Sequence, residues 1–249
     1  MTKMLSESDF IIPDWPAPSN VRALQTTRAG GYSKGPYHGL NLGDHVGDDP
    51  LLVAANRQLL TRFVPTEPVW MCQVHGIEVI DAAMASCLPE ADAAFARAPD
   101  TVCCVMTADC LPILLCNVEG SAVAAVHAGW RGLQQGVIEA AVTSMPAAAP
   151  NLMAWLGPAI GSQAFEVGDD VRGSFIKADG TSTQVFTARE NGKWLADIYL
   201  LARLRFQTMG VERIYGGDFC TSTDEQRFYS YRRDRVTGRM ATMIWIAKK

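Results

Sequence analysis

Short apolar runs bounded by turn-forming residues place the strongest constraint on the fold of this chain. Residues 102–106, 111–116 and 122–126 are three such runs, and each is consistent with a buried strand. A fourth apolar run, 152–156, stops at a glycine- and proline-rich segment that continues no regular element. Glycines and prolines are otherwise scattered, without a linker or a repeat. The sequence therefore predicts one domain, residues 1–249, with many short strands.

Helical segments are predicted around these strands. Asp49 is a good N-cap and Pro50 a good first residue for a helix that continues to about Phe63. Residues 133–144 and 197–209 are also predicted as helices, and a glycine follows the second one. About five helices with many short strands favour mixed sheets layered with helices over a regular βαβ series.

The two ends of the chain carry further strand patterns. Residues 21–27 alternate between apolar and polar types and predict a strand, which ends in a turn at residues 28–31. Residues 40–45 read as an irregular loop. Residues 227–233 and 239–246 flank a turn and predict a terminal hairpin.

Charge and hydropathy exclude several classes of partner. The net charge is −4 and charges of both signs are well mixed, which argues against a nucleic-acid partner. No apolar run approaches the roughly 20 residues of a membrane span, and the polar first ten residues lack a signal-peptide pattern. We therefore expect a cytoplasmic protein with no membrane partner; the sequence carries no signal for a particular oligomeric state. A small basic cluster near the C-terminus suits a phosphate or carboxylate and contains Arg227, Arg232, Arg233, Arg235 and Arg239.

The cysteines are an odd set of seven without the spacing of a disulfide framework, so we expect reduced and mostly buried thiols. Cys110 stands apart because it lies between Asp109 and the apolar run 111–116, at a strand boundary. Five others are interpreted as small structural residues, namely Cys72, Cys87, Cys103, Cys104 and Cys116.

Two of only four histidines lie in segments typical of metal-binding loops. His75 follows an aromatic and sulfur-containing stretch, and His127 follows the apolar run 122–126. With Cys110 they would give a transition metal three protein ligands and leave a fourth position open, as in catalytic zinc sites. None of the three has zinc-finger spacing, so spacing alone leaves open a buried thiol and two hydrogen-bonded histidines.

Six motifs that occur in one order resemble the YfiH family, also called the laccase-domain or polyphenol-oxidase family. The resemblance covers about residues 22–246, and the motif that begins at His127 is highly specific. The motifs are Leu40-Asn41-Leu42-Gly43, Gln73-Val74-His75-Gly76, Thr107-Ala108-Asp109-Cys110, His127-Ala128-Gly129-Trp130-Arg131-Gly132, Gly157-Pro158-Ala159-Ile160-Gly161 and Ser230-Tyr231-Arg232-Arg233-Asp234.

This resemblance implies a fold, a metal site and a substrate class. The fold would be one α+β domain with mixed β-sheets packed face to face and flanked by helices. The metal ligands would be His75, Cys110 and His127, usually with zinc and with copper as the alternative. The chemistry would be phosphorolysis of adenosine, inosine and methylthioadenosine, and deamination of adenosine. Copper-dependent polyphenol oxidation and editing of peptidoglycan precursors are also attributed to the family.

The residues themselves limit these activities. A multicopper oxidase needs many imidazoles, and here only His38 and His45 remain beside the candidate ligands. We therefore expect any single-copper polyphenol oxidation to be a side reaction. Zinc-dependent deamination needs a carboxylate that moves a proton, and the cytidine-deaminase signature is missing. Asp109 could serve there or orient a ligand histidine, but it could equally cap its own loop. Glu78 is expected to face solvent.

Phosphorolysis needs an anion site beside the sugar. Arg28 and Arg131 are the favoured phosphate ligands because each lies in a glycine-flanked loop of the chain. Arg232 and Arg233 are a third candidate group, whereas Arg235 and Arg239 are expected to be solvated surface residues. Other candidates for the pocket are Asn41, His45 and Gln73, although Asn41 could instead satisfy backbone groups of its own turn. Phe165 and Tyr231 are aromatic side chains that could stack on a purine or belong to the core.

Two further readings remain beside the leading one, a zinc-dependent purine nucleoside enzyme that uses Asp109, Cys110 and His127. In the first, Cys110 is the nucleophile and His127 the base of an amide hydrolase that acts on a peptidoglycan precursor. In the second, the chain is a metal- or nucleotide-binding module without turnover. The leading reading implies purine nucleosides and phosphate as partners.

Overall fold

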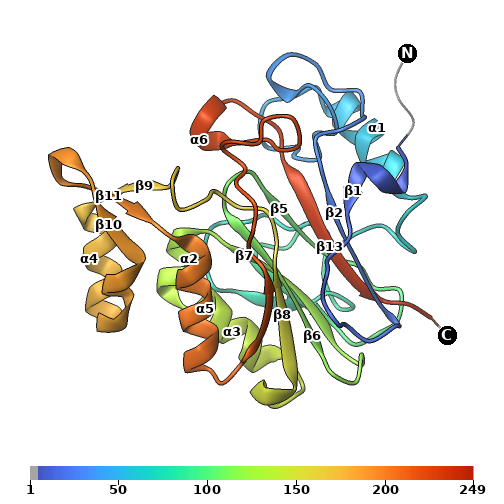
Figure 1. The fold of residues 1–249 in the computed structure, drawn as a ribbon. Helices are drawn as coiled ribbons and strands as arrows, with labels where there is room; N and C mark the ends of the chain where they lie inside the picture. The colour runs from blue at the N-terminus through green and yellow to red at the C-terminus, as the bar shows by residue number, and fades with distance from the viewer. Residues whose placement is uncertain (1–4, 249) are drawn as a thin grey trace.

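Two β-sheets pack face to face, and helices cover their outer sides (Figure 1). The computed structural model describes residues 5–248, so the first four residues of the polar N-terminal segment lie outside the described part. Within it, thirteen strands form sheets of four, three and six strands. The predicted α+β fold class is confirmed.

The four-stranded sheet is antiparallel throughout and has the order β1-β2-β13-β5. It joins strands from both ends of the chain, since β13 pairs with β2 along one edge and with β5 along the other. Its strands are β1 (Phe10–Ile11), β2 (Val21–Thr26), β5 (Cys103–Thr107) and β13 (Met240–Ile246).

The six-stranded sheet is mixed and has the order β12-β8-β6-β7-β4-β3. Its central strands are antiparallel, while β12 pairs with β8 and β3 with β4 in parallel. Its strands are β3 (Val79–Asp81), β4 (Ala93–Ala96), β6 (Leu111–Asn117), β7 (Val123–Ala128), β8 (Leu152–Leu156) and β12 (Arg213–Gly216).

The apolar runs are buried on both faces because each sheet lies between two layers. On β6, Leu114 and Cys116 belong to the core between the sheets, where they join Val105 and Ile244 of the other sheet. The alternate residues Ile113 and Leu115 belong to the core under the helices. This arrangement explains why these strands read as continuous apolar runs without alternation.

Helices form the two outer layers. In Figure 1, α2 (Trp130–Gln135), α3 (Val137–Ser144) and α5 (Ile198–Thr208) lie beside the six-stranded sheet. On the other side lies α1 (Pro50–Leu60), whose Leu60 joins a core with Leu24, Met243 and Trp245 of the four-stranded sheet. Asp49 caps α1 as predicted, because its side chain accepts a hydrogen bond from the backbone N–H of Leu51.

A small third sheet projects beside α5 (Figure 1). Its order is β10-β11-β9, and both pairs are antiparallel. Its strands are β9 (Glu166–Gly168), β10 (Phe186–Ala188) and β11 (Lys193–Ala196), and α4 (Asp169–Ala178) follows β9. Short 3-10 helices occur elsewhere in the chain and beside this sheet, at Glu7–Asp9, Gly35–Tyr37, Ala149–Asn151, Gly180–Val185 and Glu190–Gly192.

Two predicted elements are wrong. The helix predicted over 133–144 is two helices, because Gly136 has a φ of 103° and ends α2 before α3 begins. The predicted terminal hairpin does not form, since residues Tyr231–Asp234 are a short helix, α6, and β13 pairs with β2 and β5 instead. The long-range pairing of β13 carries no local sequence signal.

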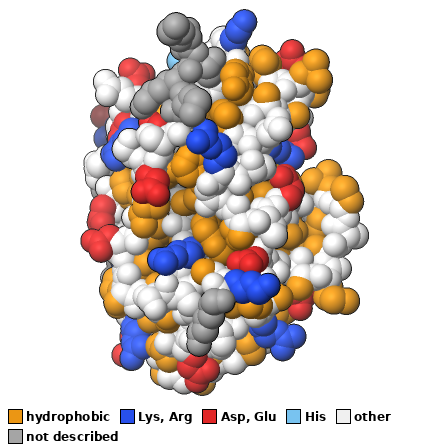
Figure 2. Space-filling view, turned by 90° about the vertical axis from the view of Figure 1, so that its right-hand side faces the viewer, with side chains coloured by type: hydrophobic (Ala, Val, Ile, Leu, Met, Phe, Trp, Pro, Cys, Tyr) orange, Lys and Arg blue, Asp and Glu red, His pale blue; other side chains and the backbone are white. Residues whose placement is uncertain are grey.

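The surface charges agree with the sequence-based expectation, whereas the burial of the cysteines agrees only in part. Acidic, basic and apolar side chains are interspersed on the face shown in Figure 2. No helix in residues 5–248 is long and apolar enough to span a membrane. The seven cysteines are free; Cys103, Cys104 and Cys116 are buried as expected, but Cys72 and Cys87 are exposed, so their prediction as buried structural residues is wrong.

Candidate active site

His75, Cys110 and His127 meet at one end of the two sheets. Cys110 immediately precedes β6 and His127 is near the end of β7, and these strands pair with Pro112 opposite His127. His75 comes from the loop before β3 and has a φ of 62°. The three donor atoms lie within 4.8 Å of one another, with 3.7 Å between Cys110 Sγ and His75 Nε2. The structure thus brings together the three residues that the sequence singled out.

The donor set and its spacing fit a transition metal. A tetrahedral zinc ion with bonds of about 2.3 Å to sulfur and about 2.0 Å to nitrogen separates these atoms by about 3.5 Å. Gly129 leaves the required room, because a Cβ atom there would lie 2.8 Å from His75 Cδ2 and 3.1 Å from Cys110 Sγ. The glycine in the His127 motif therefore has a steric reason. One sulfur and two imidazole nitrogens suit zinc and copper alike.

Asp92 supports two of the three donors, and the sequence reasoning missed it. Its Oδ1 accepts hydrogen bonds from Nδ1 of His127 at 2.7 Å and from the backbone N–H of His75 at 3.0 Å. Its Oδ2 accepts from the backbone N–H of Gly76 at 2.6 Å. The Asp92 side chain is fully buried, so this carboxylate fixes the His127 ring and the His75 loop together. Its only sequence signal was a carboxylate just before a short apolar strand.

Asp109 lines the pocket, and its side chain is hydrogen-bonded to residues of the C-terminal segment. It adopts a φ of 96° and holds the C-terminal segment against the site. Its Oδ1 accepts from the Thr221 hydroxyl at 2.6 Å, and its Oδ2 from the Ser230 hydroxyl at 3.0 Å and the Arg232 N–H at 2.5 Å. These contacts cap the distant segment at residues 221–232 and not the loop of Asp109 itself, and Asp92 makes the histidine contact considered for Asp109. Glu78 is exposed, as expected.

Electrostatics favour an ionised thiol at the centre of the group. Burial alone would raise the pKa of Cys110, but the charge and hydrogen bond of His127, followed by those of His75, lower it below the usual value. For His127, burial lowers the pKa, yet Cys110 and Asp92 outweigh burial and raise it. A thiolate is the form of cysteine that binds metal or attacks an electrophile.

A pocket of about 500 Å³ opens above these donors. Of the predicted substrate-binding residues, His45, Gln73 and Arg131 line it. Gln73 is also fixed to β5, since its amide donates to the Met106 carbonyl and accepts from the Met106 N–H. Burial, then the nearby charge of Arg239, lowers the pKa of His45. Phe165 and Tyr231 line the pocket as well, Phe165 being buried and Tyr231 exposed.

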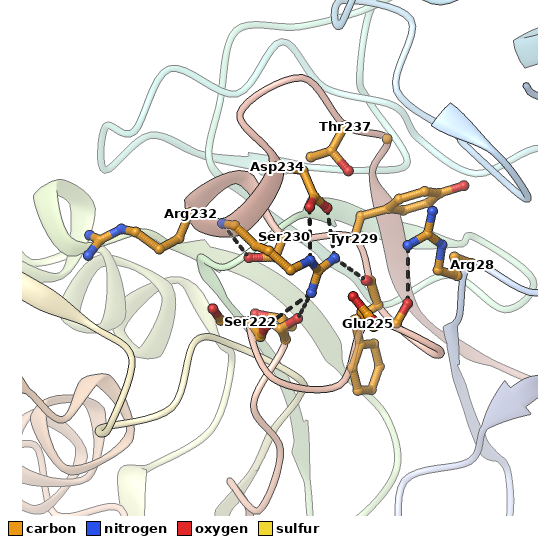
Figure 3. Close-up of polar contacts among 12 residues, drawn as sticks. Arg28, Ser222, Glu225, Tyr229, Ser230, Arg232, Asp234 and Thr237 are labelled. Atoms are coloured by element: carbon orange, nitrogen blue, oxygen red, sulfur yellow. Dashed lines mark hydrogen bonds and ion pairs between the residues drawn. The ribbon is translucent and has the colours of Figure 1, made fainter. Parts of the chain in front are cut away.

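Arg28 and Asn41 do not line this pocket, in contrast to their predicted role. The Arg28 guanidinium donates to the carbonyls of Glu225 and His38 and lies over the Tyr229 ring. Figure 3 shows it turned toward Glu225, across the close-up from Arg232. The buried Asn41 amide donates to the Gly43 carbonyl and to Asp48, which agrees with its alternative role in its own turn.

Arg235 and Arg239, predicted as solvated surface residues, both line the pocket, and Arg239 is half-buried. Their position at the end of α6 and the start of β13 follows from the long-range pairing that the sequence does not reveal. Arg232 lines the pocket too, while the Arg233 guanidinium donates to Asp234 and to three backbone carbonyls.

The pocket is strongly cationic. None of its four arginines, Arg131, Arg232, Arg235 and Arg239, has an ion-pair partner within residues 5–248. The carboxylate among the lining residues is Asp109, whose oxygens are already engaged. Unpaired guanidinium groups around a concave site are suited to bind an anion.

Known proteins resemble this chain over nearly its whole length. Residues 22–247 match the family described as multi-copper polyphenol oxidoreductase laccase. The purine nucleoside phosphorylase YfiH of Escherichia coli is 50% identical over 242 residues, which cover 96% of this chain and 99% of that protein. A purine nucleoside phosphorylase of Pseudomonas aeruginosa is 50% identical over 238 residues, covering 95% of this chain and 98% of that one.

Solved structures share the fold. A Neisseria meningitidis protein has a TM-score of 0.94 and 46% identity, and the match covers 96% of this chain and all (100%) of that one. YlmD from Geobacillus stearothermophilus has a TM-score of 0.89 and 30% identity, with 100% of both chains covered.

Proposed function

This chain belongs to the multi-copper polyphenol oxidoreductase laccase family, and we propose that it is a metal-dependent purine nucleoside phosphorylase. Its relatives at 50% identity carry that name. The family's description as multi-copper does not extend to the donors of this chain, because residues 5–248 contain one group of three such ligands. The substrates we propose are inosine, adenosine and methylthioadenosine, together with phosphate.

One observation carries the proposal: a pocket with four unpaired arginines lies directly above the three metal donors. In phosphorolysis an oxygen of phosphate bonds to C1′ of the ribose as the bond from C1′ to the purine breaks. The electron pair of that bond leaves with the purine, which takes up a proton, and the sugar leaves as its 1-phosphate, which is ribose 1-phosphate for inosine and adenosine. Little covalent help is needed, so positioning and charge stabilisation dominate.

The residues of the pocket divide the work in this proposal. The arginines hold phosphate, and Phe165 and Tyr231 provide aromatic surface for the purine. His75, Cys110 and His127 would hold zinc, with copper as the alternative occupant. A divalent ion supplies Lewis acidity there. A thiol ligand needs reducing surroundings, so we place the enzyme in the cytoplasm.

Deamination of adenosine is the second activity that we propose for this pocket, as a slower one. A metal-dependent deaminase uses a carboxylate to move a proton between water and the base. The hydrogen bonds to Thr221, Ser230 and Arg232 already occupy Asp109. We therefore expect release of purine base to exceed formation of inosine when adenosine and phosphate are both supplied.

The test is turnover of a nucleoside panel with and without phosphate. Purified protein is incubated with inosine, adenosine or methylthioadenosine. Free base is measured together with the sugar phosphate, which is ribose 1-phosphate from the first two and 5-methylthioribose 1-phosphate from the third. We expect both products in equal amounts, only when phosphate is present, and their loss after a chelator removes the metal. The proposal would be refuted if base were released at the same rate with and without phosphate. It would also be refuted if metal-loaded protein released no base from any of the nucleosides.

A second candidate function rests on the lowered pKa of Cys110 beside His127. Such a pair could open an amide of a peptidoglycan precursor through an acyl-enzyme on the sulfur. Iodoacetamide would inactivate such a hydrolase at Cys110, whereas a chelator would leave it active. Loss of activity on chelation, with recovery on adding zinc, excludes this candidate.

A further inference from the structure

Arg239 is the pocket arginine that its surroundings hold in place most completely. Its side chain is half-buried, and its Nη1 donates to the carbonyls of Thr237 at 3.1 Å and Gly238 at 3.0 Å. The other three pocket arginines lie over aromatic rings. Arg131 and Arg235 are exposed, and the half-buried Arg232 has one guanidinium hydrogen bond, to the Glu166 carbonyl. A guanidinium that is already held loses less conformational entropy when it binds a ligand.

The loop at residues 40–43 fixes the backbone of Arg239 and packs against the base of its side chain. The Asn41 side chain accepts from the backbone N–H of Arg239 at 2.9 Å, and the Leu42 N–H donates to the Arg239 carbonyl at 3.2 Å. Gly43 packs against the side chain, since a Cβ atom there would lie 2.7 Å from Cγ of Arg239. A motif that contributes no side chain to the pocket lining thus fixes the backbone of a pocket arginine by two hydrogen bonds and packs against its side chain.

Three donors of Arg239 remain available. A guanidinium has five N–H donors, and two contacts occupy Nη1. Nε and Nη2 have no hydrogen-bond partner within residues 5–248, and no carboxylate there forms an ion pair with Arg239. The parallel N–H groups of Nε and Nη2 match the spacing of two oxygens of one phosphate.

We propose that Arg239 binds the inorganic phosphate of the reaction through Nε and Nη2, and that Asn41 and Gly43 position it. This assignment rests on the proposed phosphorolysis. It also gives the Leu40-Asn41-Leu42-Gly43 motif a role: Asn41 is a positioning residue that acts through Arg239. Arg28, one of the two arginines that the sequence favoured, has no part in this subsite.

The decisive variants are Arg239→Gln and Gly43→Ala. The first removes the charge, while the second keeps it and displaces the side chain; Gly43 has no positive φ, so alanine fits the backbone itself. Arg213→Gln is the matched control, because Arg213 is exposed and lies on β12 outside the pocket. Dissociation constants for inorganic phosphate are measured by calorimetry on zinc-loaded protein without nucleoside, and KM for phosphate and for inosine separately.

We expect Arg239→Gln to weaken phosphate binding by about 10-fold to about 100-fold, the range of a charge-assisted hydrogen bond. Gly43→Ala should weaken it less, by roughly threefold to about 10-fold. KM for inosine and the zinc content should stay at wild-type values in both variants. A KM for inosine that rises in step with KM for phosphate would indicate general damage to the pocket and would contradict the subsite.

The outcomes separate this inference from the proposed function. If wild-type protein shows phosphate-dependent turnover but both variants keep its phosphate affinity, the subsite is wrong and the function stands. If wild-type protein binds phosphate through Arg239 but releases no base from any nucleoside, the subsite stands and the function is wrong. Should Arg239→Gln fail to fold, Gly43→Ala decides, and unchanged phosphate binding there overturns the inference.

Discussion

The metal donors and the pocket arginines are built in opposite ways. His75, Cys110 and His127 have short side chains, and two of them are fixed by the pairing of β6 with β7. The arginines are long, come from α2, α6 and the start of β13, and reach the same pocket from different directions. The first group has one geometry that depends on the backbone, whereas the exposed arginines of the second group, Arg131 and Arg235, can rearrange around a ligand.

This difference explains why motifs located one group and not the other. A short ligand side chain must lie where its backbone places it, so a local motif reports the site. An arginine can extend its head far from its own backbone and often snorkels toward solvent. Arg28 lies in a suggestive glycine-flanked loop and turns away, while Arg239 lacks such a signal and lines the pocket.

Loss of a donor should have the largest effect. Cys110→Ala removes the sulfur ligand, and if the metal contributes about 4 kcal/mol to the transition state, phosphorolysis falls about 1000-fold. Steady-state rates with saturating inosine and phosphate, together with zinc content, measure this. Cys87→Ala is the control, because Cys87 is exposed and is not among the residues that line the pocket. If Cys110→Ala kept wild-type turnover, the three metal donors would not be the reaction centre.

The space beside the donors should be almost as sensitive as the donors themselves. Gly129→Ala introduces a methyl group within 2.8 Å of the His75 ring and 3.1 Å of the Cys110 sulfur, so at least one donor must shift. We expect zinc affinity to fall by about 10-fold to about 100-fold, comparable to the loss of a supporting contact. Competition with a fluorescent chelator measures this affinity.

Gly173→Ala is the matched control for that substitution. Gly173 lies inside α4, and a Cβ atom there would meet nothing within 4 Å. This variant should keep its zinc affinity and gain about 1 kcal/mol of stability, since alanine favours a helix more than glycine does. Equal zinc affinities for the two alanine variants would show that the donor group is not tightly packed.

Asp92→Asn should have an intermediate effect. The amide cannot accept all the hydrogen bonds that the carboxylate accepts from His127, His75 and Gly76. We expect zinc affinity to fall by about 10-fold or more, the usual cost of losing a carboxylate behind a ligand histidine. Calorimetric zinc titration of the two proteins measures this difference.

The same residue gives a pH signature. Burial would raise the pKa of Asp92, but the His127 hydrogen bond and charge, with the backbone N–H groups of Gly76 and His75, lower it below 3.8. A lowered folded-state pKa stabilises the protein above the unfolded value, and the contribution is lost as pH falls through the folded value. Metal-free wild-type protein should therefore lose more stability than Asp92→Asn as the pH falls below about 4, the ordinary pKa of a carboxyl group. The free energies of unfolding are measured in urea. Equal losses for wild-type protein and Asp92→Asn would show that Asp92 does not have a lowered pKa in the folded protein.

Arg28→Gln should have the smallest kinetic effect. The substitution removes two hydrogen bonds to backbone carbonyls and the contact with the Tyr229 ring. We expect a loss of about 1 kcal/mol in the free energy of unfolding, with KM for phosphate unchanged. A clear rise in that KM would return Arg28 to the anion site and weaken the contrast between the two groups.

The fold could be predicted where local patterns determine it. Short apolar runs gave β5, β6 and β7 because strands between two layers are apolar on both faces. The break at Gly136 and the pairing of β13 with β2 and β5 depend on tertiary contacts and were missed. In the site, the motif residues converged, but Asp92 was missed because its partners lie 16 to 35 positions away along the chain.

The most direct test is the coordination of the bound metal. The protein is purified without chelator, loaded with zinc, and examined by metal analysis and by X-ray absorption at the zinc edge. We predict a single ion per chain bound by the Cys110 sulfur and the two imidazole nitrogens of His75 and His127. A spectrum without a sulfur ligand, or protein that does not retain zinc, would contradict the account.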